Sequence, residues 1–263
     1  MPQVGIKILD RDGKVLAAGR DESEVFLVYG FSYREGDRIV VEAEEYPGYY
    51  WLQLDDARGS SLVYLTGEMR YEIPFGEKRS NLSPKTFWGD RHLLFVRRAK
   101  AFEIGQYRNL ALNVWDQHGA ANCYPHAFAN VETRNEAVFA AMNAIDGVTV
   151  TCSHGEWPYE SWGINRREDA ELTVDFGREV EVDRIVLYTR ADFPHDNWWR
   201  RATVSFSDDT AVDWEMEKSS RPHSLCLEKK CVSWVKLSHL IKSEEPSPFP
   251  ALTQIEVYGR ETV

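Results

Sequence analysis

Short runs of strand-forming residues, separated by turns, fill most of this chain. They lie at 4–10, 14–19, 24–31, 37–44, 49–55, 61–67, 69–75 and 92–99, and again at 171–177, 184–190, 202–208, 234–240 and 253–259. Helical periodicity is scarce, and the best case, NEAVFAAMNAI at 135–145, predicts only a turn or two of helix. Strands at short spacing without helices between them are typical of sandwiches and barrels. We therefore expect an all-β protein.

The chain of 263 residues is long enough for two domains. The character of the sequence changes near 105–112, and we expect an N-terminal β-sandwich of no recognised family at 1–107 and a second β-sandwich at 108–263. No flexible linker lies between them, so the two domains are expected to pack together. The EYPGYY turn presents Tyr46, Tyr49 and Tyr50, which we expect to contact the other domain rather than a ligand.

The charge and hydropathy exclude several kinds of partner. The formal net charge is −11 and no basic stripe offsets it, which argues against nucleic acid and against an anionic membrane. No stretch approaches the ~18 apolar residues of a membrane span, and none near the start has signal-peptide length. The sequence as given predicts a cytoplasmic protein, or an extracellular one if it has been trimmed.

The cysteines show no CxxC spacing. Cys226 and Cys231 flank LEKK, which resembles a hairpin loop that would place them on neighbouring strands. In a cytoplasmic protein, free thiols are expected over a disulfide. The other cysteines are Cys123 and Cys152.

Familiar catalytic motifs are missing. The sequence has no GxSxG, HExxH or GxGxxG motif and no P-loop, and nothing in it supplies a nucleophile for His195. A glycan-processing hydrolase nevertheless stays open as an alternative, with His195 or a carboxylate as the acid or base. That alternative requires a pocket with two carboxyl groups ~5–9 Å apart.

An ordered series of short motifs marks the second half of the chain. They are NLALN (109–113), MNAIDGVTVT (142–151), ELTVDFGREVEVDRIVLYTR (171–190), ATVSFSDDT (202–210), WVKLSHL (234–240) and ALTQIEVYG (251–259). In this order they resemble the discoidin, or coagulation factor 5/8 C-type, family, and especially its family 32 carbohydrate-binding modules. The resemblance covers residues 109–260 and implies a galactose-binding-like β-sandwich of jelly-roll type.

The same resemblance implies a structural calcium ion at NAIDG. The positions that correspond to its ligands are Asn143, Asp146, Val148, Thr151, Thr253 and Gln254. This sequence departs from the family at Val148, where Asp or Asn is usual, and at Gln254, where Glu is usual. Because calcium affinity depends on the number of charged ligands, we expect weak calcium binding, or its replacement by hydrogen bonds.

Two loops combine aromatic rings with polar side chains, namely SHGEWPYESWGINRRED (153–169) and TRADFPHDNWWRR (189–201). An aromatic face covers the C–H face of a sugar, while charged and amide side chains bind its hydroxyl groups. In the resembling family, loops at one end of the sandwich hold the sugar. The candidate ligand-binding residues are His154, Trp157, Tyr159, Trp162, Arg190, Asp192, His195, Asn197 and Trp198.

Some of these rings are expected to belong to the core instead. Tryptophan packs readily inside strand-rich proteins, so at least two of the four between 157 and 199 should be packing residues. In the pair Trp198–Trp199, one ring should point inward and the other outward. A third loop, 116–134, is expected either to cover the site or to pack on the first domain.

The favoured hypothesis is non-catalytic carbohydrate binding by the aromatic loops, with a mono- or oligosaccharide as the partner. Neither nucleic acid nor membrane is expected, and the oligomeric state stays open. Besides the hydrolase, a second alternative is a protein–protein interaction module, in which the discoidin fold serves as a scaffold. That alternative predicts an exposed apolar patch instead of a polar groove.

Overall fold

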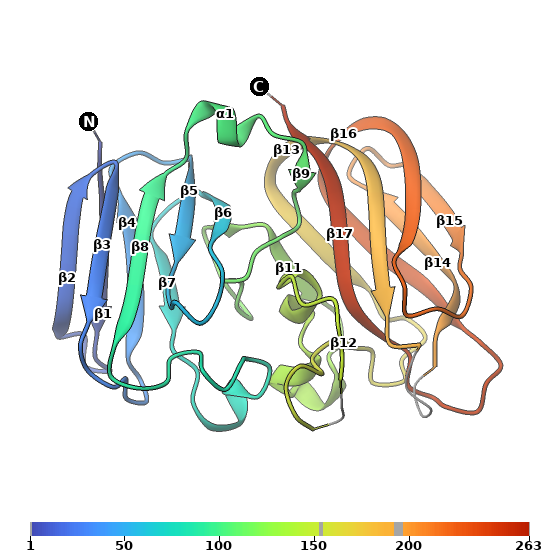
Figure 1. Ribbon diagram of the computed structural model, residues 1–263. Helices are drawn as coiled ribbons and strands as arrows, with labels where there is room; N and C mark the ends of the chain where they lie inside the picture. The colour runs from blue at the N-terminus through green and yellow to red at the C-terminus, as the bar shows by residue number, and fades with distance from the viewer. Residues whose placement is uncertain (1, 153–154, 192–196, 263) are drawn as a thin grey trace.

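The computed structural model describes residues 2–152, 155–191 and 197–262. Figure 1 shows two β-rich halves side by side, the first in blue to green and the second in yellow to red. Short helical turns lie mainly between the halves and at their ends. The expected all-β fold with two sandwich domains is confirmed.

The first domain consists of two sheets that pack face to face. In spatial order, one sheet contains β2 (Val15–Glu22), β1 (Gln3–Leu9), β4 (Arg38–Ala43) and β7 (Met69–Glu72). The other contains β10 (Cys123–Tyr124), β6 (Ser61–Leu65), β5 (Gly48–Gln53), β8 (His92–Arg98) and β3 (Glu24–Tyr29). Alternate side chains of these strands point inward, so that Ile6, Ile39, Leu52 and Leu94 are buried in one core.

The second domain is built on one large, bent sheet. Its order is β12 (Trp162–Gly163), β17 (Ala251–Glu261), β13 (Leu172–Thr189), β16 (His223–Lys242), β14 (Trp199–Phe206) and β15 (Ala211–Glu215). Two short strands extend it, since β11 (His126–Ala129) pairs with β13 and β9 (Arg108–Asn109) pairs with β17.

Strand β13 bends sharply and contributes to both layers of this sandwich. Its pairing with β16 breaks between Asp175 and Val180. Gly177 lies within the break at φ +67°, and a Cβ there would stand 2.4 Å from the ring of Tyr124, so only glycine fits. The bend lets the two ends of one strand face each other across the core.

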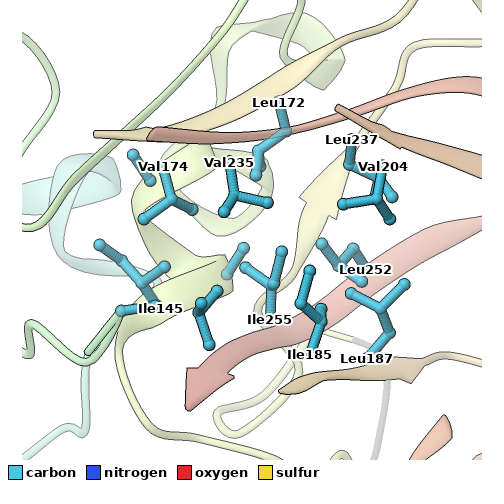
Figure 2. Close-up of a cluster of buried hydrophobic side chains, with 14 of the residues drawn as sticks. Ile145, Leu172, Val174, Ile185, Leu187, Val204, Val235, Leu237, Leu252 and Ile255 are labelled. Atoms are coloured by element: carbon cyan, nitrogen blue, oxygen red, sulfur yellow. The ribbon is translucent and has the colours of Figure 1, made fainter. Parts of the chain in front are cut away.

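Figure 2 shows the core that this bend encloses. One row of side chains includes Leu172 and Val235, and the facing row includes Ile185 and Ile255. All four are fully buried. The run of apolar residues in β13 therefore supplies both walls of the same core.

The segment expected to form a turn or two of helix, 135–145, does form helical turns of the 3₁₀ type. They are η2 (Thr133–Asn135), η3 (Ala137–Phe139) and η4 (Ala141–Ile145). The remaining helical turns are η1 (Gly76–Arg79) and α1 (Ala101–Ile104). Among the described residues, no helix is both long and apolar enough to cross a membrane.

The chain between the two domains contributes to both cores. Leu110 and Ala111 are buried in the second core, whereas Trp115 and Cys123 are buried in the first. The indole Nε1 of Trp115 donates a hydrogen bond to the Leu52 carbonyl at 3.0 Å. The start of the 116–134 loop thus packs on the first domain, one of the two outcomes expected for it.

The cysteine geometry corrects the hairpin expected at 226–231. Both Cys226 and Cys231 lie on strand β16, because the chain continues in one direction through LEKK instead of turning back. Cys226 is opposite Arg184 of β13 and Cys231 is opposite Glu181, with a register shift between the two pairs. They therefore do not face each other across a hairpin. All four cysteines are free thiols, as expected.

Candidate functional site

Three loops meet at one end of the second domain, and their described residues are 150–152 with 155–161, 189–191 with 197–199, and 243–250. The first two are joined by Arg190, whose Nη1 donates a hydrogen bond to the Tyr159 carbonyl at 2.7 Å. The backbone N–H of Arg190 also donates to the Ala251 carbonyl at the start of β17. The convergence of the two aromatic loops, which the sequence predicted, is therefore present in the structure.

Asn197 joins the second of these loops to the third. Its Nδ2 donates to the carbonyls of Glu245 and Ser247 at 3.0 and 2.6 Å, and its Oδ1 accepts from the Ser243 hydroxyl at 2.7 Å. Asn197 is fully buried, so these bonds satisfy polar groups that water does not reach. This side chain fixes the position of the 243–250 loop.

Aromatic rings remain accessible on all three loops. Trp157 is 37% exposed and Phe249 is 42% exposed, while Tyr159 and Trp198 are half-buried. We call these four residues, together with the charged side chains of Arg166, Lys218 and Glu245, the loop-end surface.

The charged members of the loop-end surface lie against its rings. The Arg166 guanidinium is 4.6 Å from the centre of the Phe249 ring, a cation–π distance. The Glu245 carboxylate accepts hydrogen bonds from Trp198 Nε1 at 3.4 Å and from Lys218 Nζ at 2.7 Å. Rings are thus placed next to both donors and acceptors of hydrogen bonds.

Three of the residues predicted to bind ligand are buried, and the structure corrects their expected role. Trp162 lies in the core with its ring centre 6.3 Å from that of Trp199, and its Nε1 donates to the Val131 carbonyl. Arg190 and Asn197 are buried because they hold the loops together. None of the three presents a free face or edge to a ligand in this conformation.

The remaining predicted residues divide into two groups. Trp157, Tyr159 and Trp198 belong to the loop-end surface, and their contact with a ligand stays a prediction. His154, Asp192 and His195 lie outside the described residues. The expectation for the tryptophans as a group is confirmed, since Trp162 and Trp199 are packing residues and Trp198 points outward where Trp199 points inward.

Sequence reasoning missed Phe249, Lys218 and Glu245. The segment SEEPSPFP (243–250) indicates from its sequence only a proline-rich loop before the last strand. A phenylalanine between two prolines cannot alternate with buried neighbours in a strand, and this signal would have placed its ring on a loop. Lys218 carries no comparable signal.

The six positions implied for calcium do not form a set of free ligands. Asp146 Oδ1 accepts the N–H of Val148 at 2.8 Å, and Gln254 Oε1 accepts the N–H of Gly147 at 3.2 Å. Asn143 Oδ1 accepts from Asn81 Nδ2 of the first domain at 2.8 Å. Thr253 is buried and Thr151 is partly exposed.

A positive charge from the protein also lies beside this set. Arg58 Nη2 of the first domain is 3.9 Å from Asp146 Oδ2. Within the described part of the chain, no group of three or more His, Cys, Asp or Glu side chains is arranged to hold a metal ion. With one carboxylate, side-chain oxygens that already accept hydrogen bonds and a neighbouring guanidinium, the side chains at these positions do not fit a calcium ion, which takes six to eight oxygen ligands.

Two buried carboxyl groups of this region, Asp146 and Glu160, have raised pKa values. Burial raises the pKa of Asp146 to about 8, and Arg58 acts in the opposite direction. Burial likewise raises the pKa of Glu160, and Arg58 is among the groups that lower it. Burial therefore favours the neutral form of both carboxyl groups, and the Arg58 guanidinium is among the groups that favour the ionised form.

Arg58 and Asp146 line a cavity of about 640 Å³ between the two domains. Its walls also include Asn81 and Asn143, which are hydrogen-bonded to each other, and Asp116, which pairs with His126 at 2.7 Å. This group of polar contacts between the domains therefore lies around a hollow.

An apolar patch is present, but it lies on the first domain. Phe26 and Val28 of the edge strand β3 and Leu93 of β8 are exposed on the outer face of their sheet. The interaction-module alternative predicted such a patch for a discoidin scaffold. The patch here belongs to a different domain.

Comparison with known families identifies the second domain. The family model of the F5/8 type C domain matches residues 128–225. This stretch includes the end of β11, all of β12, β13, β14 and β15, and the first two of the three loops. Residues 128–225 therefore match the F5/8 type C, or discoidin, family, and the resemblance found in the sequence is confirmed over that stretch.

Comparison with curated proteins gives no match. Several solved structures are similar. Chitosan-binding module 1 of a chitosanase/glucanase from Paenibacillus sp. IK-5 is 19% identical over 57% of this chain and 98% of its own, with a TM-score of 0.41. The family 32 module of NanJ from C. perfringens, in complex with galactose, is 17% identical over 50% and 91%, with a TM-score of 0.37. The lectin domain of lectinolysin, complexed with Lewis B antigen, is 18% identical over 59% and 97%, with a TM-score of 0.41.

Proposed function

We propose that this protein binds carbohydrate through the loop-end surface, without catalysing a reaction on it. The observation that carries this proposal is the exposure of Trp157 and Phe249 on loops of an F5/8 type C domain. A sugar has a C–H face that gains from covering such rings.

The charged side chains of the loop-end surface supply the polar half of this recognition. Arg166 beside Phe249 donates hydrogen bonds, and Glu245 beside Trp198 accepts them. Sugar hydroxyl groups need both, and charge-assisted bonds fix the orientation of the ring. An open surface covers little of its ligand, so we expect a weak affinity.

The proposal is tested by titrating the full chain with a sugar panel. The panel contains galactose, N-acetylgalactosamine, fucose, a Lewis b oligosaccharide and chitosan oligomers, and binding is followed by calorimetry and tryptophan fluorescence. We expect binding of at least one sugar, and a loss of about tenfold or more in affinity for Trp157→Ala and Phe249→Ala, which corresponds to the ~1–3 kcal/mol of one stacked ring.

The matched control is Trp88→Ala, because Trp88 is 73% exposed but lies in the first domain next to Arg79. This variant should bind as the unchanged chain does. No binding to any sugar of the panel overturns the proposal. An equal loss of affinity in Trp88→Ala overturns the assignment of the binding site to the loop-end surface. Release of cleaved product during incubation would favour the hydrolase alternative.

A further inference from the structure

Arg58 is held in place before it meets the second domain. It lies in the turn between β5 and β6, where its N–H donates to the Asp55 carbonyl at 3.3 Å. Its guanidinium lies over the ring of Trp115, 5.4 Å from the centre, and Trp115 is fully buried. Stacking on a buried ring leaves this charge little freedom.

The guanidinium points at the turn that follows η4. Arg58 Nη2 is 3.9 Å from Asp146 Oδ2, and the two side chains are 13% and 6% exposed. Because both are largely removed from water, their attraction is screened far less than that of a surface pair. Removing either charge would leave the other buried without a counter-charge.

A second contact from the first domain reaches the same turn. Asn81 Nδ2 donates to Asn143 Oδ1, and Asn143 Nδ2 in turn donates to the carbonyls of Ala137 and Ser161. Asn81 and Asn143 are both buried. The turn is therefore tied to the first domain at both its beginning and its end.

We propose that Arg58 takes the place of a metal cation in the second domain, so that the turn at 141–148 is held by the first domain and not by bound calcium. The guanidinium supplies a positive charge 3.9 Å from the Asp146 carboxyl group, at the turn where the family resemblance implies a cation. Gln254 completes the arrangement, because its neutral amide accepts a hydrogen bond from the Gly147 N–H of this turn without adding a further negative charge.

The first experiment measures the thermal unfolding of the full chain in EGTA, in ~5 mM CaCl2 and in ~5 mM MgCl2, which exceeds the ~1 mM dissociation constants of weak calcium modules. We expect the same Tm in all three. A Tm that rises with calcium but not with magnesium overturns the proposal. This measurement needs no variant, so it stands even where a substitution prevents folding.

The second experiment replaces Arg58 by a neutral residue and then adds a carboxylate at position 254. Arg58→Gln should lower Tm by roughly 5 °C or more, since a buried carboxylate loses its partner. The double variant Arg58→Gln/Gln254→Glu should gain a calcium-dependent rise in Tm and measurable calcium binding by calorimetry. An unchanged Tm for Arg58→Gln overturns the proposal, as does a double variant that folds without any response to calcium.

The matched control is Arg20→Gln. Arg20 also belongs to the first domain and pairs with Glu44 at 2.8 Å, but both side chains are exposed. Its Tm should match that of the unchanged chain, with no response to calcium. A drop as large as that of Arg58→Gln would show that the loss comes from removing any arginine, and would overturn the proposal.

Discussion

The hydroxyl of Tyr49 in the first domain donates a hydrogen bond of 2.7 Å to Glu261 Oε2 at the end of the last strand. The same carboxylate pairs with Arg108 at 2.5 Å and with Arg178 at 2.6 Å. Arg178 lies over the Tyr49 ring, 5.2 Å from its centre. A buried carboxylate thus joins β5, β9, β13 and β17, and it forms a second polar contact between the domains.

Glu261→Gln should destabilise the whole chain. Burial opposes the ionisation of Glu261, but Arg178 outweighs it and holds the pKa of the carboxyl below its ordinary value. Neutralising the carboxylate leaves both arginines without a counter-charge, which costs about 3 kcal/mol in free energy of unfolding. Urea denaturation measures this loss. Glu44→Gln, at an exposed ion pair, is the control and should unfold like the unchanged chain. Equal stability of the two variants would contradict the role given to Glu261.

The raised pKa of Tyr49 predicts that the folded chain loses stability at alkaline pH. Burial, together with the hydrogen bond to Glu261, raises the pKa of Tyr49 to about 12. An unfolded tyrosine ionises near ~10, so between these values the unfolded chain loses a proton that the folded chain keeps. The free energy of unfolding therefore falls as the pH rises from ~10 to 12. In Tyr49→Phe, the free energy of unfolding should decrease less over this pH range than in the unchanged chain. The same decrease in both proteins would count against the prediction.

Substitutions of two tryptophans in the second domain should have different effects, one on the stability of the fold and the other on sugar binding. Trp199→Ala removes a fully buried ring and should lower the free energy of unfolding by about 3–5 kcal/mol. Trp157→Ala, on the loop-end surface, should cost about 1 kcal/mol or less while it weakens sugar binding. Guanidinium denaturation and sugar titration of both variants make the comparison. A strongly destabilised Trp157→Ala would mean that this ring is a packing residue.

Asn197→Ala should release the 243–250 loop. The substitution leaves the carbonyls of Glu245 and Ser247 and the Ser243 hydroxyl without their buried partner, at a cost of about 2–4 kcal/mol. Faster hydrogen exchange of this loop is the expected signal. Unchanged exchange there, in a variant that folds, would show that other contacts position the loop.

The sequence predicted the fold well because each strand carries its own signal. Apolar alternation in β1 and the apolar runs of β13 indicate buried faces without knowledge of any distant residue. The ordered motifs then predicted the discoidin domain. The contact of Tyr49 with the other domain was also expected, whereas Tyr46 and Tyr50 bond within the first domain, to Ala43 and Glu45.

The direction of individual rings in the loops was harder to predict. Trp157 and Trp162 lie in the same short segment, yet one is exposed and the other is fully buried. Loops have no regular period, so spacing does not reveal which side chain turns inward. Arg58 gave no signal either, because its partner Asp146 lies in the other domain and only the folded chain brings them together.

The position of β17 has a consequence for how the chain emerges from a ribosome. This strand lies between β12 and β13, and its last residue, Glu261, fastens the domains to each other. Synthesis proceeds from the N-terminus, so every other described strand is finished while β13 still has an open edge. A nascent chain halted before residue 251 would contain a folded first domain and a second domain in which one edge of β13 is unpaired. Such an edge is a binding site for chaperones and can pair with strands of neighbouring chains.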